Sequence, residues 1–129
     1  MKGSRALELI PYAGFLGVTI ESDSDGIVCV LPFRDDLVGN AALPALHGGV
    51  VGAFLELTAL IGLIEATDDD RVPKPINFSV NYLRAAGPRA THGRAEIVKH
   101  GRRIANVRVL AWQDDPAKPV AAGTGNFLL

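Results

Sequence analysis

The chain has 129 residues, of which 48% are hydrophobic and 21% charged, and its formal net charge is −1. This length fits one domain, residues 1–129, with a sizeable core. No surplus of positive charge is present to neutralise a phosphate backbone, which argues against nucleic-acid binding. Cys29 is the sole cysteine, which excludes an intrachain disulfide and a cysteine-based zinc site, and no metal is expected. The N-terminal residues lack the continuous apolar stretch of a signal peptide, so we expect a cytoplasmic protein.

The first part of the chain indicates one short helix, two strands and a loop. The expected elements, in chain order, are a helix over 4–11, a strand over 15–21, a turn over 22–26, a strand over 27–33 and a loop over 34–46. Ser4 is suited to the N-cap of the helix and Pro11 to its end. Gly39, Asn40 and Pro44 lie in the last of these segments, which shows no stable periodicity and is therefore interpreted as a loop.

The most apolar segment runs from Gly48 to Ile64 and predicts a long helix over about 47–66. Apolar side chains surround its whole circumference, so the helix must be enclosed on most sides. The segment has about the minimum length of a membrane span, but it carries a glutamate near its middle. We therefore interpret it as a buried core helix and expect no membrane.

The last part of the chain predicts strands. In residues 76–84 apolar side chains alternate with polar ones, which is the period of a half-buried strand; the apolar ones are Ile76, Phe78, Val80 and Tyr82. Further strands are expected over 90–99, 103–113 and 119–128. The links between strands are too short for crossover helices, so consecutive strands should pair antiparallel. One enclosed helix with five or six antiparallel strands predicts an α+β domain whose sheet wraps around the helix.

Glu56 is the most informative single residue. It is the only ionisable residue between Gly48 and Ile64, and Thr58 is the only other polar side chain there. Burying an unpaired carboxylate is strongly unfavourable, so such a group either finds partners or becomes reactive. The alternative is a glutamate on an exposed stripe or one satisfied by the backbone. No clear polar stripe accompanies it on the helix, so we favour a catalytic role.

The start of this helix offers a second chemical feature. Gly48 and Gly49 place unpaired backbone N–H groups at the electropositive end of the helix, where a carbonyl or phosphate can approach closely. Such a start can act as an oxyanion hole, or the glycines can simply form a tight turn. His47 can serve as a nucleophile or base, as an N-cap, or as a positioning residue for the loop. No catalytic triad or metal-ligand spacing accompanies it, which favours positioning.

At HGGVVGAFLE, residues 47–56, the sequence resembles the hot-dog thioesterases of the PaaI-like or 4-hydroxybenzoyl-CoA thioesterase group. The resemblance continues through LVGNAALPALHGG before the helix, INFSVNYLRAAGP after it, and GRRIANVRVLA and VAAGTGNFLL at the end. It therefore covers nearly the whole chain in the same order. It implies the hot-dog fold, with five or six antiparallel strands around one central helix, and a homodimer or homotetramer with active sites between subunits.

The resemblance also implies roles for individual residues. Glu56 stands at the position of the acid that serves as nucleophile or as general base for water. Gly48 or Gly49 would polarise the thioester carbonyl from the neighbouring subunit, and Asn40 would help to hold water or the leaving group. Many relatives have Asp where this chain has Glu56. Pro75 stands near where relatives often have Ser or Thr, and Asn77 where many have Asp, so water positioning would be weaker here.

These observations predict hydrolysis of an acyl-CoA thioester to a free acid and coenzyme A, which is part of the substrate rather than a cofactor. The phosphates of coenzyme A need cations, and Arg84, Arg102 and Arg103 are the best placed, at a strand end and a turn. The alternative is a non-catalytic acyl- or aryl-CoA binding protein, suggested by Pro75. Hydration or dehydration of an enoyl thioester would need an Asp/His pair in a different placement, which we do not find in the sequence.

Overall fold

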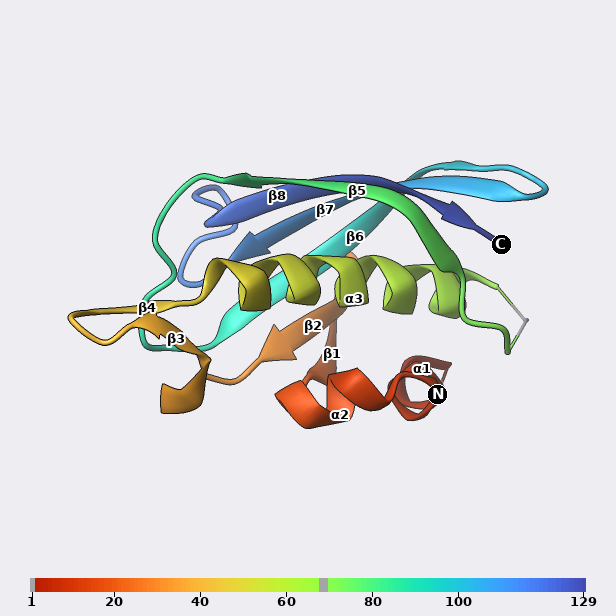
Figure 1. The fold of residues 1–129 in the computed structure, drawn as a ribbon. Helices are drawn as coiled ribbons and strands as arrows, with labels where there is room; N and C mark the ends of the chain where they lie inside the picture. Colours follow the sequence, from red (N-terminus) through yellow and green to blue (C-terminus); the bar gives the residue numbers. More distant parts are fainter. Residues whose placement is uncertain (1, 68–69) are drawn as a thin grey trace.

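The computed structural model describes residues 2–67 and 70–129. Within these residues one six-stranded antiparallel sheet curves around one long helix, in the strand order β1-β2-β6-β7-β8-β5 (Figure 1). This confirms the predicted hot-dog fold. The elements are α1 (Lys2–Leu9), α2 (Pro11–Leu16), β1 (Thr19–Asp23), β2 (Gly26–Leu31), η1 (Asp35–Leu37), β3 (Val38–Asn40), β4 (Leu43–Leu46), α3 (Gly48–Ala66), β5 (Lys74–Tyr82), β6 (Thr91–His100), β7 (Ile104–Trp112) and β8 (Ala121–Leu128).

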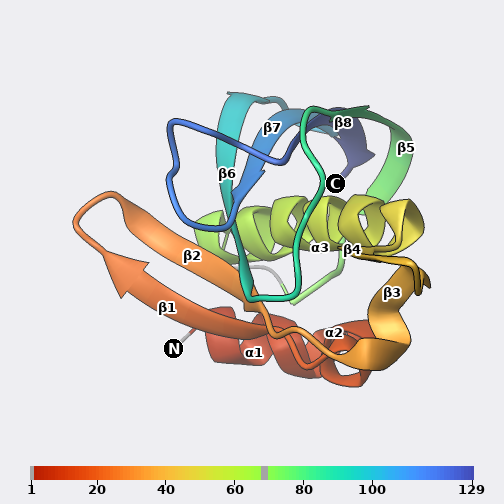
Figure 2. The ribbon, with the colours of Figure 1, turned by 90° about the vertical axis from the view of Figure 1, so that its left-hand side faces the viewer.

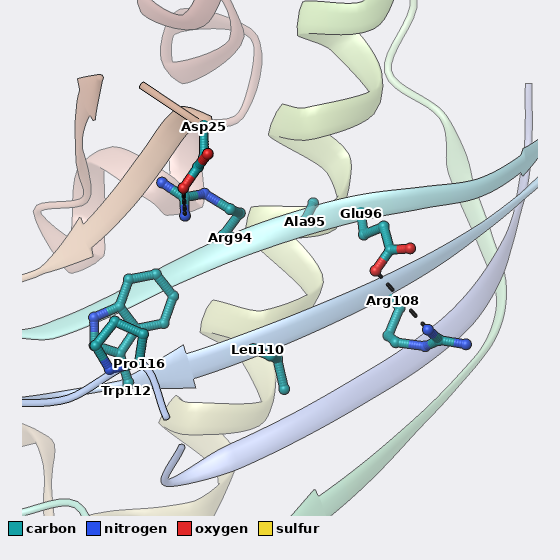
Figure 3. A pocket seen from close by; sticks show the side chains of 8 residues that line it. All are labelled: Asp25, Arg94, Ala95, Glu96, Arg108, Leu110, Trp112 and Pro116. Carbon is teal, nitrogen blue, oxygen red and sulfur yellow. Dashed lines mark ion pairs between the residues drawn. The ribbon is translucent and has the colours of Figure 1, made fainter. Parts of the chain in front are cut away.

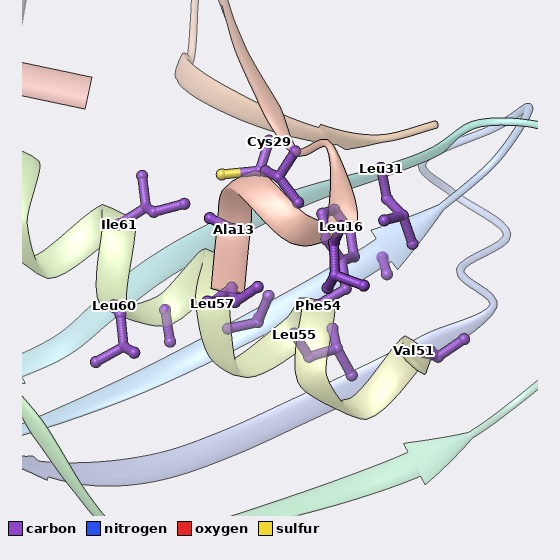
Figure 4. Packing of buried hydrophobic residues seen from close by; sticks show 14 of the residues in the cluster. Ala13, Leu16, Cys29, Leu31, Val51, Phe54, Leu55, Leu57, Leu60 and Ile61 are labelled. Carbon is purple, nitrogen blue, oxygen red and sulfur yellow. The ribbon is translucent and has the colours of Figure 1, made fainter. Parts of the chain in front are cut away.

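The helix α3 forms the centre of the core, as its composition predicts. Side chains from Val51 to Ile64 pack against the concave face of the sheet, and the N-terminal helices α1 and α2 cover another side of α3 (Figure 4). In β7 the burial alternates strictly, and the inward residues Ala105, Val107, Val109 and Ala111 are fully buried. Small residues let the helix approach the strands, because a Cβ on Gly93 of β6 would lie 2.9 Å from the Phe54 ring. The helix is long and apolar enough to cross a membrane, but its place in the core makes it the core helix of a soluble domain.

The N-terminal segment differs from the sequence prediction. It forms two helices, and α1 begins before Ser4, so Ser4 is not the N-cap. Pro11 does not simply end a helix: it occupies the first turn of α2, where its missing N–H removes no internal hydrogen bond. Phe15 therefore lies in a helix and not at the start of the first strand. Figure 2 shows both helices below the sheet, beside β1.

Residues 34–46 are not an irregular loop, contrary to our interpretation. They form the short helix η1 and the hairpin of β3 and β4. Leu37 and Leu46 are buried and anchor the hairpin on the body of the domain. Long-range backbone hydrogen bonds complete the anchorage, from Leu46 N to Ala86 O at 2.9 Å and from His47 N to Leu37 O at 2.8 Å.

Strand β5 also departs from the expectation that consecutive strands pair. It pairs with β8 and not with β6, because the segment 83–90 passes the start of α3 and enters the sheet beside β2 (Figure 1). The other consecutive strands, β1 with β2, β6 with β7 and β7 with β8, do pair antiparallel. Strand β5 is consequently an edge of the sheet, and its Ile76 and Tyr82 are 53% and 57% exposed.

Candidate active site at the start of helix α3

The first turn of α3 leaves one backbone donor free. His47 is the N-cap, and its Nδ1 atom accepts a hydrogen bond of 2.8 Å from the Gly49 N–H. The N–H groups of Val50 and Val51 both donate to the His47 carbonyl oxygen, at 3.0 and 3.2 Å. Within residues 2–67 and 70–129 the Gly48 N–H has no acceptor. Of the two glycines, Gly48 is therefore the one whose amide can bind a ligand atom.

The hairpin before the helix holds His47 in place. A Cβ on Gly39 would lie 3.0 Å from the His47 Cα and 3.1 Å from its Cδ2 atom, so only glycine permits this approach. Asn40 lies on the same hairpin, exposed to solvent, and its Oδ1 atom accepts a hydrogen bond of 3.0 Å from the Ala42 N–H. The side-chain oxygen of Asn40 thus stabilises the turn, and within the described residues its NH₂ group makes no hydrogen bond.

Glu56 lies on the least covered face of α3. Residues 49, 52, 53 and 56 recur at helical spacing and are exposed or half-buried, whereas the faces turned toward the sheet are buried. Among the described residues no side chain or backbone group forms a hydrogen bond or ion pair with Glu56. Within one chain the carboxylate is therefore unpartnered and half-buried on an open stripe of α3. The sequence pattern predicts an enclosed carboxylate instead, and a glutamate on an exposed stripe is the alternative to a catalytic acid.

Tyr82 contacts the start of α3, and sequence reasoning did not predict this contact. It is the last residue of β5, and its hydroxyl donates a hydrogen bond of 2.7 Å to the Gly48 carbonyl oxygen. The alternation in β5 identified Tyr82 only as an apolar residue. Its separation of 34 residues from Gly48 leaves no local signal for the contact.

The three arginines proposed for phosphate binding lie in two places. Arg84 lines a hollow of about 410 Å³ next to Gly48, and its Nη1 atom donates to the Pro119 carbonyl oxygen at 2.8 Å. Arg102 and Arg103 line a hollow of about 620 Å³ at the turn between β6 and β7, together with Lys99. Arg102 also borders a hollow with Thr67, the C-cap of α3. These two arginines are thus at the opposite end of α3 from Gly48.

Asn77 has a structural partner rather than a place beside Glu56. Its Oδ1 atom accepts hydrogen bonds of 3.2 Å from both the backbone N–H and the side-chain amide of Asn126. Asn126 in turn accepts a hydrogen bond of 3.0 Å from Asn106. This row of amides joins β5, β8 and β7. Pro75 lies at a break in the pairing of β5 with β8, where the register shifts between Pro75 and Asn77.

A further hollow of about 360 Å³ lies on the outer face of the sheet (Figure 3). Arg94 lies over the Trp112 ring at 5.9 Å, and the Glu96–Arg108 ion pair, at 3.8 Å, spans β6 and β7. The hollow is lined by two acidic and two basic side chains that pair with one another, so we assign no catalytic or binding role to it. Within the described residues no group of His, Cys, Asp and Glu could hold a metal ion.

The comparisons with known proteins identify the family and the fold. Residues 39–128 match the family model of the acyl-CoA thioesterase N-terminal domain. A solved protein from Chromobacterium violaceum shares 37% sequence identity and has a TM-score of 0.77, over 98% of this chain and 88% of that chain. A phenylacetic acid degradation-related protein from Ralstonia eutropha shares 25% identity with a TM-score of 0.83, over the full length of both chains. No match was found among curated proteins.

One more structure bears on the fold. A Bacillus halodurans protein solved with CoA has 21% identity and a TM-score of 0.80, over 98% of this chain and 86% of that chain. The fold and the free donor at the start of α3 define a hot-dog protein of the thioesterase class. The chain belongs to the acyl-CoA thioesterase domain family.

Proposed function

We propose that the protein hydrolyses an acyl-CoA thioester to a free acid and coenzyme A. The observation that carries the proposal is a pair of unsatisfied groups on α3: the Gly48 N–H without an acceptor and the Glu56 carboxylate without a partner. An N–H at a helix start stabilises the negative charge that develops on a thioester oxygen. Membership of the thioesterase family and the CoA bound by the Bacillus halodurans protein support the same substrate class.

The chemistry divides between these two groups. The Gly48 N–H donates to the carbonyl oxygen of the thioester and stabilises it as the tetrahedral intermediate forms. Glu56 either removes a proton from the attacking water or attacks the carbonyl carbon itself. The carbon–sulfur bond then breaks, and the coenzyme A sulfur takes up a proton from Glu56 or from solvent. On the nucleophilic route an acyl–Glu56 anhydride remains, and a water molecule hydrolyses it to the free acid and the Glu56 carboxylate. His47 would position the helix start, and the side-chain NH₂ group of Asn40 would donate to water or to the leaving group.

The spacing of the two groups supports a site built from two chains. Glu56 follows Gly48 by eight residues, which at about 1.5 Å per residue is about 12 Å along the helix axis. A side chain of glutamate does not span that distance, and reacting atoms must approach to about 3–3.5 Å. We therefore propose a homodimer, alone or within a homotetramer, in which Gly48 of one protomer works with Glu56 of its partner.

Strand β5 is the element suited to form this dimer. In the described part of the chain the outer edge of β5 is unpaired. The open stripe of α3 lies next to β5, because Gly52 of the stripe is close to Tyr82 and Val80. An unpaired edge with exposed apolar side chains favours pairing with another strand. Antiparallel pairing of two copies of β5 about a twofold axis gives one continuous sheet and two equivalent sites. We place this assembly in the cytoplasm.

The dimer also explains the two locations of the arginines. The arm between the sulfur and the first phosphate of coenzyme A has about thirteen bonds, like an extended peptide of about four residues, or about 15 Å. The 19 residues of α3 span about 28 Å, so Arg102 and Arg103 cannot reach the phosphates of a thioester held at Gly48 of their own chain. Pairing of β5 with its copy about a twofold axis beside Phe78, the middle residue of the strand, would bring the partner's Lys74 beside Tyr82. In the sheet Lys74 pairs with Leu128, and Leu128 pairs with Ile104, the residue after Arg103. The partner's Arg103 would therefore lie close enough to bind those phosphates.

The donor role of Gly48 can be tested without disturbing the helix. Proline at the first helical position is well tolerated, and the ψ angle of His47, 136°, suits the residue before a proline. Gly48→Pro replaces the N–H by a ring carbon and also adds a Cβ, whereas Gly48→Ala keeps the N–H and adds the same Cβ, at an ordinary distance of 3.5 Å from the Tyr82 ring. We expect kcat to fall about 100- to 1000-fold in G48P, and far less in G48A. Equal activity of the two variants would exclude Gly48 as the donor.

The role of Glu56 is tested by Glu56→Gln against a panel of acyl-CoAs, with Glu65→Gln on another face of the same helix as control. We expect E56Q to lose several orders of magnitude in kcat and E65Q to remain active. Mixing G48P with E56Q under conditions of subunit exchange should restore part of the activity in the mixed dimers. Absence of recovery despite proven exchange would place the whole site in one chain.

The second candidate is an acyl-CoA binder without catalysis. Pro75 favours it, since no hydroxyl is available at that position to orient water, and Asn77 is held by Asn126. A binding measurement combined with a thiol-release assay separates the two functions. Tight binding of acyl-CoA without release of coenzyme A would establish the binder.

A further inference from the structure

The peptide group between Gly48 and Gly49 is held at both ends. Its N–H donates to the Nδ1 atom of His47 at 2.8 Å, and its carbonyl oxygen accepts the Tyr82 hydroxyl at 2.7 Å. Since Nδ1 is an acceptor, the proton of the neutral imidazole is on Nε2. A continuous row of hydrogen bonds therefore runs from the Tyr82 hydroxyl through the peptide to the His47 ring.

The geometry points to Tyr82 as a positioning residue for the oxyanion donor of the proposed thioester hydrolysis, on which this inference rests. Two consecutive glycines make the first turn conformationally permissive, and helix ends fray. The row of hydrogen bonds fixes the peptide group that follows Gly48, and so restricts the backbone rotation that the two glycines would otherwise allow. Tyr82 thus keeps the amide aimed at one point, which is the preorganisation that an oxyanion site requires.

Gly52 provides independent support for this assignment. The Tyr82 hydroxyl that donates to the Gly48 carbonyl oxygen lies next to Gly52. A Cβ on Gly52 would lie only 3.2 Å from the hydroxyl oxygen. A glycine inside a helix is unfavourable by itself. Its presence at this position leaves space for the hydroxyl. Helix α3 thus supplies the donor, the Gly48 N–H, and strand β5 supplies Tyr82, which orients it.

Two substitutions disturb the contact by different means. Tyr82→Phe removes the hydroxyl and keeps the ring, and we expect kcat to fall about tenfold, or about 1.4 kcal/mol, with KM for acyl-CoA unchanged. Gly52→Ala displaces the hydroxyl sterically, and we expect it to lower kcat while the melting temperature stays the same or rises. In the Y82F background G52A should lower kcat no further.

The decisive experiment is a cycle with G48P. If Tyr82 acts through the Gly48 amide, Y82F lowers kcat in the wild-type protein and has no further effect in G48P. Full activity of Y82F beside a deficient G48P would overturn the role of Tyr82 and leave the proposed function intact. Equal losses in both backgrounds would also overturn it, since they indicate a general structural effect. Wild-type protein without thioester hydrolysis would refute the proposed function itself.

Discussion

The contact between α3 and β6 allows a stability prediction whose sign follows from the structure. Gly93 of β6 faces Phe54 and Thr58, and a Cβ at Gly93 would lie 2.9 Å from the Phe54 Cε2 atom and 2.9 Å from the Thr58 Oγ1 atom. Both side chains are buried, at 0% and 2% exposure, and the Thr58 hydroxyl donates to the Phe54 carbonyl oxygen at 2.8 Å. Neither side chain can move into solvent.

Two opposing effects act on Gly93→Ala. Loss of glycine's freedom in the unfolded chain favours the variant by about 0.5–1 kcal/mol. Overpacking of a filled core disfavours it by about 1–3 kcal/mol. Because the neighbours cannot move away, the second effect should dominate, and we expect a net loss of about 1–2 kcal/mol. Gly14→Ala is the matched control, since it adds a Cβ to α2 with nothing within 4 Å, and it should be neutral or stabilising.

The assay is equilibrium unfolding in urea at one fixed protein concentration, because association would make stability depend on concentration. The m value should be the same for the wild type and both variants. A Gly93→Ala variant as stable as the wild type would refute the inference that α3 is seated tightly on β6. A double variant with Phe54→Leu should regain part of the loss, since the ring is the principal obstacle.

Three further predictions concern the rest of the fold. Burial raises the pKa of the Cys29 thiol to about 11, so at pH 7.5 a thiol reagent should label the folded chain far more slowly than the chain in guanidinium chloride; prompt labelling would contradict this burial. Gln113 accepts from Gly87 N–H at 2.9 Å and donates to its carbonyl at 3.0 Å, so Gln113→Leu should destabilise by about 1–3 kcal/mol in urea unfolding. The hydrogen bond from Arg94 lowers the pKa of Asp23 from its ordinary value of 3.8. The pair therefore stabilises the fold above pH 3.8, and this stabilisation is lost as the pH falls through the lowered pKa of Asp23. Arg94→Met should therefore differ from wild type in thermal stability at pH 7 and converge with it in strong acid.

The sequence predicts best those elements whose environment is uniform along their length. Helix α3 is apolar on all sides and is predicted almost to the residue, because a single core encloses most of it. Strands β6, β7 and β8 are predicted within one or two residues, since period-two alternation records one buried face. In these segments local pattern and tertiary burial agree.

Elements fixed by long-range contacts are the ones that the sequence does not predict. Pro11 is compatible with the end of one helix and with the start of the next, and only packing decides between them. The hairpin of β3 and β4 contains Gly39 and Pro44, and its hydrogen bond to Ala86 spans 40 positions of the chain. The pairing of β5 with β8 is likewise settled by the path of segment 83–90.

The candidate site shows the same division. His47, Gly48 and Glu56 are recognisable from their spacing, because the helix itself fixes their relative positions. Tyr82 is not recognisable, since its role depends on where the end of β5 meets the start of α3. The choice between Gly48 and Gly49 also required the structure, because His47 occupies the Gly49 amide and leaves the other free.

The least covered stripe of α3 connects the fold to the proposed function. A helix that is apolar on all sides should be enclosed, yet the stripe of residues 49, 52, 53 and 56 is exposed or half-buried within one chain. Gly49, Gly52 and Ala53 add little bulk there, so a second chain and a ligand can both approach the backbone. A partner covering this stripe would exclude water around Glu56 and strengthen every electrostatic interaction in the site. An association that covered this stripe would thus both enclose α3 and assemble the reacting groups.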